Sequence, residues 1–119
     1  MDFNNKKSIY LQIVDYFLER ILRLELKEND RIASVREIAV HLEVNPNTVM
    51  RSYSYLQDKN IVFNKRGIGY FIAVGAYDKT LDLKKEEFLK EEVPSFIKMM
   101  HLLKMQCSDI ENLQNNLKN

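Results

Sequence analysis

The sequence predicts a mainly α-helical protein: a winged helix-turn-helix, made of three helices and a β-hairpin wing, with a short C-terminal helical dimerisation tail. Two capped helical segments stand close together in residues 34–59, two β-rich runs then flank the stretch KRGIG, and a further helical pattern follows. We place the winged-helix domain at residues 1–77 and the tail at residues 78–119.

The composition is that of a globular protein. The 119 residues are 45% hydrophobic and 29% charged, which argues against a disordered chain. No apolar run reaches the roughly 18 residues of a membrane span, and the N-terminus lacks the apolar stretch of a secretory signal. The single cysteine, Cys107, cannot form an internal disulfide. These features predict a cytoplasmic protein without a membrane partner.

The net charge of +1 gives no support for nucleic-acid binding by itself. The distribution of charge is more informative, because residues 46–77 contain four basic residues and one acidic residue. A local excess of this kind can still form a basic face on a nearly neutral protein.

The first two helices are predicted from apolar periodicity and from capping residues. Residues 8–26 have the spacing of an amphipathic helix of about five turns, which Asn29 and Asp30 should follow with a turn. Ser34 and Glu37 then match a capping box, in which each side chain satisfies a free backbone N–H of the other. A short second helix should therefore open at SVREIAVHL.

The third helix has the strongest start signal in the chain. Asn45 is suited to the N-cap, and Pro46 follows at the first helical position, where its missing N–H has no cost. This helix should run to about Lys59, with Val49, Tyr53 and Leu56 facing inward. Two short helices joined by a tight turn make a helix-turn-helix.

A β-hairpin with a basic tip should follow. The runs IVFN and YFIAV are rich in strand-forming residues, and Gly67 and Gly69 allow the positive φ angles of a turn. Lys65 and Arg66 lie at the predicted tip.

The C-terminal tail is predicted to be helical from Thr80 onward. Pro94 should kink or split it, and Ser108 with Glu111 should form a second capping box before the last helix. An apolar stripe on one helical face should form a dimer contact through Leu89, Val93, Phe96, Ile97, Met100 and Leu103.

The tail has two possible ways to cover this stripe. We expect it to pair with a second copy of the chain, and the alternative is that it folds back on the first helix. About 42 residues after the wing are too few to enclose the roughly 300 Å³ of a small-molecule pocket. The existence of an effector stays open.

Three motifs occur in order within residues 8–75: VNPNTV, the RSY that follows it, and KRGIGYF in the hairpin. In these motifs and their separations the chain resembles the GntR-type bacterial transcription regulators, most closely their small YtrA-like branch. The resemblance implies a winged-helix repressor that binds an operator as a homodimer through its tail helices. The chain departs from the family pattern at Ala33, where proline is usual, and at ENDR, where PGDR is usual.

The third helix is the main candidate for DNA contact. The residue types at its N-terminal end, Asn45, Asn47 and Thr48, can pair with adenine, contact a thymine methyl group or reach a phosphate. Arg51, one turn later, can read guanine or hold a phosphate. Without the resemblance, an equally good interpretation is that Asn45 is only a cap and Arg51 only a solvated charge.

Further candidates lie on the second helix, in the third helix and in the wing. By the resemblance, Arg36 approaches the phosphate backbone, although it could instead pair with Glu37 or Glu43. Lys65 and Arg66 suit the minor groove, unless the tip only aids solubility. The complete set of candidate DNA-binding residues is Ser34, Arg36, Asn45, Asn47, Thr48, Arg51, Tyr53, Lys65, Arg66 and Gly67.

Other functional classes lack their residues in this sequence. His41, His101 and Cys107 do not form a set with the spacing of a zinc site, and no phosphate-binding glycine loop or catalytic group is recognisable. We expect no metal, no cofactor and no enzymatic activity. The sequence thus predicts a DNA-binding transcriptional regulator, expected to repress from a palindromic double-stranded DNA operator as a homodimer. The alternative is a winged-helix protein–protein interaction module.

Overall fold

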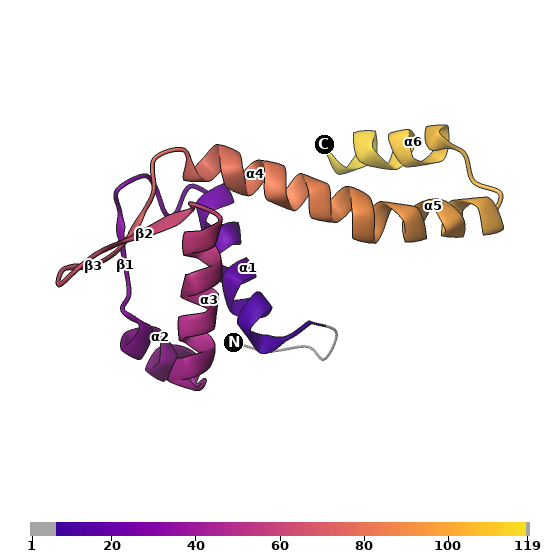
Figure 1. The fold of residues 1–119 in the computed structure, drawn as a ribbon. Coiled ribbons are helices and arrows are strands. Elements are labelled where there is room, and N and C mark those ends of the chain that lie inside the picture. Colours follow the sequence, from indigo (N-terminus) through magenta and orange to yellow (C-terminus); the bar gives the residue numbers. More distant parts are fainter. Residues whose placement is uncertain (1–6, 119) are drawn as a thin grey trace. The chain divides into compact units, whose positions relative to one another are not determined.

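The computed structural model describes residues 7–118 (Figure 1). The first six residues, part of the segment in which no secretory signal is expected, lie outside the described residues, as does residue 119. The chain divides into two units, Met1–Asp82 and Leu83–Asn119. The division falls within helix α4 (Ala76–Glu87), which begins four residues before the predicted start at Thr80. Ala76 and Thr80 are both buried, so the first turns of α4 belong to the first unit.

Three helices build the first unit around an apolar core. Helix α3 (Pro46–Asp58) packs against both α1 (Ile9–Leu22) and α2 (Val35–Leu42) (Figure 1). Helix α1 buries one apolar face, as its periodicity predicts. The core residues of the three helices are Ile13, Val14, Phe17, Leu18, Ile21, Ile38, Ala39, Leu42, Val49, Tyr53 and Leu56.

Helix α1 is shorter than predicted. It ends at Leu22, whereas the apolar pattern continues to residue 26. Leu24 adopts a left-handed conformation with φ 61°, and the N–H of Glu25 bonds back to the carbonyl of Arg20. This is a Schellman-type helix end. The predicted last turn was wrong because apolar spacing does not reveal a left-handed residue.

The start signals of α2 and α3 are confirmed. The hydroxyl of Ser34 accepts a hydrogen bond of 3.1 Å from the Glu37 N–H, and the Glu37 carboxylate accepts one from the Ser34 N–H. The side chain of Asn45 accepts a hydrogen bond of 2.8 Å from the Asn47 N–H, and Pro46 stands in the first turn. The connection between the two helices turns at Glu43, which has φ 56°.

A three-stranded antiparallel sheet completes the first unit. Its strands β1 (Arg31–Ile32), β2 (Val62–Lys65) and β3 (Gly69–Ile72) have the spatial order β1-β3-β2. Strands β2 and β3 are the predicted hairpin, and Gly67 and Gly69 have the expected positive φ angles of 78° and 147°. Strand β1 was not predicted, because two residues give no periodic signal.

The second unit contains a π-helix, η1 (Phe88–Glu92), followed by α5 (Val93–Leu102) and α6 (Cys107–Leu117). In η1 the N–H of Val93 bonds to the Phe88 carbonyl, five residues back. Pro94 has no N–H for the carbonyl of Lys90, so the ordinary helical pattern cannot continue through this turn. The predicted kink or break at Pro94 thus takes the form of a π-helical turn, η1, just before this residue.

The capping box predicted for the last helix was wrong. Helix α6 begins at Cys107, so Ser108 is already inside the helix. Gln106 has the extended backbone of an N-cap, and its N–H donates a 2.9 Å hydrogen bond to the Asp109 carboxylate. The chain reverses direction before α6 (Figure 1), with Lys104 in a left-handed conformation at φ 56°. The N-cap is therefore Gln106, two residues before the predicted Ser108.

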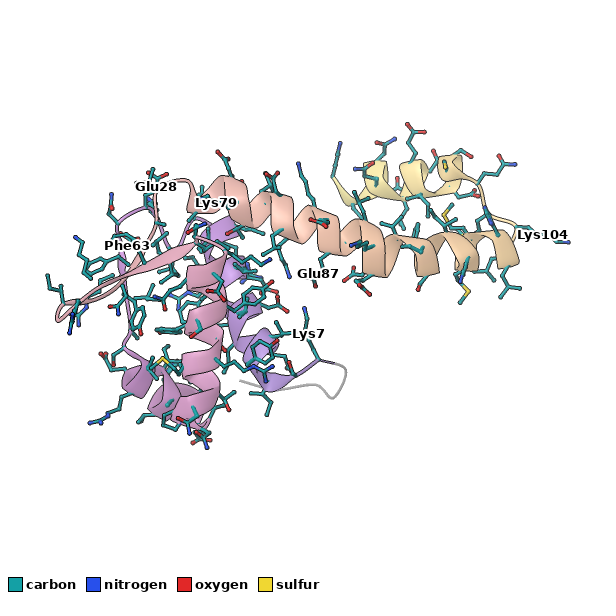
Figure 2. All side chains as sticks on the ribbon, in the orientation of Figure 1. Lys7, Glu28, Phe63, Lys79, Glu87 and Lys104 are labelled. Atoms are coloured by element: carbon teal, nitrogen blue, oxygen red, sulfur yellow. The ribbon has the colours of Figure 1, made fainter. Side chains whose placement is uncertain are left out.

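The second unit leaves its apolar residues accessible. No residue from Leu83 to Lys118 is buried in the single chain. Large apolar side chains are exposed here, such as Leu89 (64%) and Phe96 (50%). Figure 2 shows side chains projecting from all of these helices. None of the helices in residues 7–118 combines the length and the apolar character that a membrane crossing requires.

Candidate nucleic-acid interface

The N-terminal end of α3 presents an exposed polar surface. Asn45 and Asn47 are exposed and Thr48 is half-buried. The side-chain oxygen of Asn45 is occupied as the helix cap, so this residue orients the end of the helix. The Asn47 side chain remains accessible one residue further on. Amide and hydroxyl groups at this end of a helix can contact base edges and phosphates.

Arg51 extends this surface by one helical turn. Its guanidinium carbon lies 3.8 Å from the centre of the Tyr10 ring, in a cation–π contact with the first turn of α1. Arg51, Asn47 and Thr48 also line one open hollow of about 330 Å³, together with Ser8, Ile9 and Tyr10. The structure thus brings these three predicted residues of α3 to one place.

Helix α2 contributes a second set of groups. Ser34 is half-buried and its hydroxyl caps the helix, while Arg36 is exposed. Both residues line a hollow of about 460 Å³ with Glu37, Val40 and His41. Arg36 forms no ion pair with Glu37, Glu43 or any other carboxylate of residues 7–118, so its partner lies outside the described chain or is solvent.

The wing carries cations on the solvent side of its sheet. Lys65 and Arg66 are exposed at the turn, and the space around Gly67 is open. The Lys65 ammonium lies 4.6 Å from the centre of the Phe71 ring, which stacks on the Phe63 ring labelled in Figure 2. These contacts hold the ammonium end of Lys65 over the aromatic face of the sheet.

Arg31 is a candidate that the sequence interpretation missed. It lies on β1 opposite Phe71, and its Nε atom would be 3.0 Å from a Cβ atom at Gly69. The absence of a side chain at Gly69 is therefore what lets the Arg31 guanidinium approach the turn that carries Lys65 and Arg66. Only the pairing of β1 with β3 reveals this proximity, and the sequence holds no signal of it.

The cations of the first unit differ in their ion pairing. Arg20 pairs with Glu25, and Arg23 pairs with Glu19, both at the C-terminal part of α1. In contrast, the basic residues of α2, α3 and the sheet make no ion pair with a carboxylate of residues 7–118. These unpaired residues are Arg31, Arg36, Arg51, Lys65 and Arg66. Exposed cations without local counter-charges are suited to a polyanionic ligand.

The structure contradicts one of the predicted DNA-binding residues. Tyr53 is 0% exposed, and its hydroxyl donates a hydrogen bond to the carbonyl oxygen of Ala33. Its ring packs edge-on against Phe17 and Tyr70, with centroids 5.5 and 4.8 Å apart. A buried hydroxyl that is already bonded cannot reach a phosphate. Tyr53 instead ties α3 to the residue before the Ser34 cap.

Replacing Tyr53 by phenylalanine should therefore reduce stability without affecting DNA contact. The Tyr53→Phe variant leaves the Ala33 carbonyl without its donor, which we expect to lower the free energy of unfolding by about 1–2 kcal/mol. Burial raises the pKa of Tyr53, with neighbouring Tyr70 adding to the effect. The unfolded chain then ionises first, so stability should fall as pH rises above about 10, and less steeply in the variant.

Chemical denaturation at pH 7 and pH 11 measures both effects, and Tyr77→Phe is the matched control because Tyr77 is exposed. DNA affinity should equal that of the wild type at a temperature where both chains are folded. A selective loss of DNA affinity in Tyr53→Phe would restore Tyr53 to the interface.

Within residues 7–118, no three His, Cys, Asp or Glu side chains come together as metal ligands would. His41 lies on the exposed side of α2, and Cys107 is exposed at the start of α6.

A family model and two relatives place the chain among bacterial transcriptional regulators. Residues 9–72 match the family model described as bacterial regulatory proteins, gntR family. The chain is 42% identical over 98 residues to the uncharacterised HTH-type transcriptional regulator YhcF of Bacillus subtilis strain 168, covering 82% of this chain and 79% of YhcF. It is 34% identical over 97 residues to the HTH-type transcriptional repressor YtrA of the same strain, covering 82% and 74% of the two chains.

Solved structures agree with this assignment. A GntR-family transcriptional regulator from Bacteroides thetaiotaomicron has a TM-score of 0.77 and 47% identity, covering 92% of this chain and 96% of that one. A GntR-family regulator from Listeria monocytogenes has a TM-score of 0.76 and 30% identity, with 96% and 98% coverage. The predicted winged-helix fold and the predicted YtrA-like relationship are both confirmed. This chain belongs to the GntR family of bacterial regulatory proteins and is a DNA-binding transcriptional regulator, not an enzyme.

Proposed function

We propose that the protein is a cytoplasmic repressor that binds a palindromic DNA operator as a homodimer. The observation that carries this proposal is the open hollow that Asn47, Thr48 and Arg51 line together at the N-terminal end of α3. These three residue types supply amide, hydroxyl and guanidinium groups, which are the groups that read base edges in the major groove. The relative YtrA is named a transcriptional repressor, which supports the proposed sign of regulation.

The polar residues at the start of α3 have separate proposed roles. Asn47 is placed to pair with adenine, and Arg51 to bond the N7 and O6 acceptors of guanine or a phosphate. Thr48 contacts a phosphate or a thymine methyl group, and Asn45 fixes the end of the helix from which these side chains project. Because α3 begins at Pro46, Asn47, Thr48 and Arg51 lie in its first two turns, the part of a recognition helix that enters the groove.

The second helix and the wing would hold the DNA backbone and the minor groove. Ser34 and Arg36, at the start of α2, are proposed to contact phosphates. Lys65 and Arg66 are proposed to enter the minor groove, where the negative potential attracts cations, and the open space around Gly67 lets the backbone approach. These residues lie outside the recognition helix, so the protein would contact the DNA backbone and the minor groove in addition to the major groove.

Arg31 adds a cation to the wing contact. Its position over Gly69 places its guanidinium beside the turn that carries Lys65 and Arg66. Three cations close to one turn favour a backbone phosphate more strongly than two.

The tail is proposed to form the dimer. Leu89, Phe96 and Ile97 are 64%, 50% and 43% exposed in the single chain, and exposed apolar side chains that gather on one surface mark an interaction site. A second copy could cover both tails at once, because a two-fold interface joins the same surface on each subunit. The proposed interface comprises Leu89, Val93, Phe96, Ile97, Met100 and Leu103. In this proposal residues 1–77 bind DNA and residues 78–119 dimerise.

Selection of DNA from a randomised double-stranded library tests the proposal. The wild-type chain should enrich two inverted copies of a short half-site whose centres lie about one DNA turn, or about 34 Å, apart, with the wing shifting that spacing. The enriched duplex is called the selected operator below. Enrichment of a single half-site would contradict the dimer, and no enrichment would favour the alternative of a protein–protein interaction module.

Operator binding should also depend steeply on salt. With about four phosphate contacts per subunit, a dimer neutralises about eight phosphates, and the log–log slope of affinity against salt concentration should be near −7. Fluorescence anisotropy with the selected operator, at salt concentrations from about 50 to about 300 mM, measures this slope. Removing Arg36 in an Arg36→Ala dimer should make the slope less steep by about two. A slope close to zero would contradict docking on the phosphate backbone.

A further inference from the structure

Tyr10, in the first turn of α1, contacts α3 through both its backbone and its ring. Its carbonyl oxygen accepts a 2.7 Å hydrogen bond from the hydroxyl of Ser52, which is completely buried. Its ring lies under the guanidinium of Arg51, with the guanidinium carbon 3.8 Å from the ring centre. Arg51 and Ser52, which are consecutive in α3, thus both contact Tyr10 of α1. The hydrogen bond from Ser52 holds the Tyr10 backbone in place and so helps to position its ring.

The ring restrains Arg51 without covering the groups that bind DNA. A distance of 3.8 Å is contact distance, so the guanidinium rests on the face of the ring. A guanidinium held in this way keeps N–H donors at its edge, and Arg51 still lines the open hollow that it shares with Asn47 and Thr48. No carboxylate of residues 7–118 forms an ion pair with Arg51 and competes for these donors.

We propose that Tyr10 is a positioning residue for DNA recognition: its ring holds the Arg51 guanidinium, before DNA arrives, at the open hollow that Asn47 and Thr48 also line. This inference rests on the proposed function of that surface. A flexible arginine loses rotamer freedom when it binds, and an arginine that is already held loses less. The difference corresponds to about two- to tenfold in affinity per protomer.

A residue that only packs α1 against α3 would behave differently. Its loss would lower stability, but its effect on DNA affinity would not depend on Arg51. The two roles therefore separate in a double-mutant cycle, which measures the coupling between two side chains. The phenylalanine variant separates the ring from the hydroxyl, because Tyr10→Phe keeps the ring face.

The experiment compares full-length wild type with Tyr10→Phe, Tyr10→Leu, Arg51→Ala and the Tyr10→Leu/Arg51→Ala double variant. Dissociation constants are measured for the selected operator and for an unrelated duplex of equal length, at a temperature where all chains are folded. We expect Tyr10→Phe to bind like the wild type and Tyr10→Leu to bind the operator about two- to tenfold more weakly per protomer. We expect the double variant to bind no more weakly than Arg51→Ala alone, because Tyr10 acts through Arg51.

NMR of the free protein provides a readout that needs no DNA. The Arg51 Nε–H signal should be shifted upfield by the ring in the wild type and in Tyr10→Phe, and this shift should be lost in Tyr10→Leu. If Tyr10→Leu is not folded, Tyr10→Met replaces it, because methionine also fills space without a ring.

The outcomes distinguish this inference from the function on which it rests. If the wild type selects an operator but the cycle is additive, or if Tyr10→Phe binds as weakly as Tyr10→Leu, the positioning role is overturned and the DNA-binding surface stands. If the wild type selects no operator, the proposed function is overturned together with this inference.

Discussion

Replacing Phe96 and Ile97 by glutamate should convert the full-length protein into a monomer and weaken binding to the selected operator by about 100-fold or more. Both side chains are largely exposed in the single chain, so two glutamates there cost the monomer little. In the proposed dimer they would bring four like charges into an apolar contact. With the dimer lost, the second DNA contact would no longer be intramolecular, and one head on a half-site would bind weakly.

Ser95→Glu/Lys98→Glu is the matched control, because these positions lie on the opposite side of α5 and also add negative charge. Analytical ultracentrifugation at micromolar concentration and anisotropy with the operator measure both properties. A Phe96→Glu/Ile97→Glu protein that remains a dimer, or a wild type that is already a monomer, would contradict the proposed role of the tail.

Replacing Asn47 and Arg51 by alanine should have the second largest effect, and it should change specificity as well as affinity. A side chain that pairs with a base contributes about 1–3 kcal/mol of discrimination, and its loss relaxes the preference at that base. We therefore expect Arg51→Ala to bind the selected operator and its single-base variants with more similar affinities. Arg66→Ala, at the wing, should instead weaken binding to all of these duplexes more nearly alike, because the minor groove distinguishes base pairs less well than the major groove does.

Lys59→Ala is the control for loss of a positive charge, since Lys59 caps the opposite end of α3. Unfolding curves should show that Asn47→Ala, Arg51→Ala and Lys59→Ala remain folded, because all three side chains are exposed. Equal losses of affinity in Arg51→Ala and Lys59→Ala would show that net charge, not the face at the start of α3, controls binding.

The parts of the fold that depend on neighbours in sequence could be predicted. The caps formed by Ser34 with Glu37 and by Asn45 are bonds between residues two or three positions apart, so their residue types identify them. The same reasoning failed at Ser108, because a left-handed turn at Lys104 moved the helix start to Cys107. A capping motif names compatible residues, but the backbone that enters the helix decides which residue is used.

The apolar periodicity of α3 identified its buried face and should have excluded Tyr53 from the DNA surface. Val49, Tyr53 and Leu56 share one helical face, and all three are 0% exposed. A tyrosine on that face needs an internal partner for its hydroxyl, which the Ala33 carbonyl provides. A tyrosine hydroxyl can contact a phosphate only from an exposed face of a helix, and Tyr53 lies on the buried face.

Contacts between residues distant in sequence were beyond prediction. The stack of Arg51 on Tyr10 depends on the packing of α3 against α1, and the approach of Arg31 to Gly69 depends on the pairing of β1 with β3. Neither contact has a periodic or motif signal. They add two residues, Tyr10 and Arg31, to a candidate site whose other members were predicted from local patterns and from the family resemblance.

An NMR titration of the ¹⁵N-labelled full-length chain with the selected operator tests most directly that α3 and the wing form the DNA-binding face. The account predicts that amide signals of residues 34–37, 45–51 and 64–69 shift, whereas those of residues 19–25, at the far end of α1, stay in place. An unrelated duplex at equal concentration should produce smaller shifts in the same residues, because it offers phosphates but not the matching bases. Unchanged signals in residues 45–51 and 64–69 on addition of the operator would contradict the account.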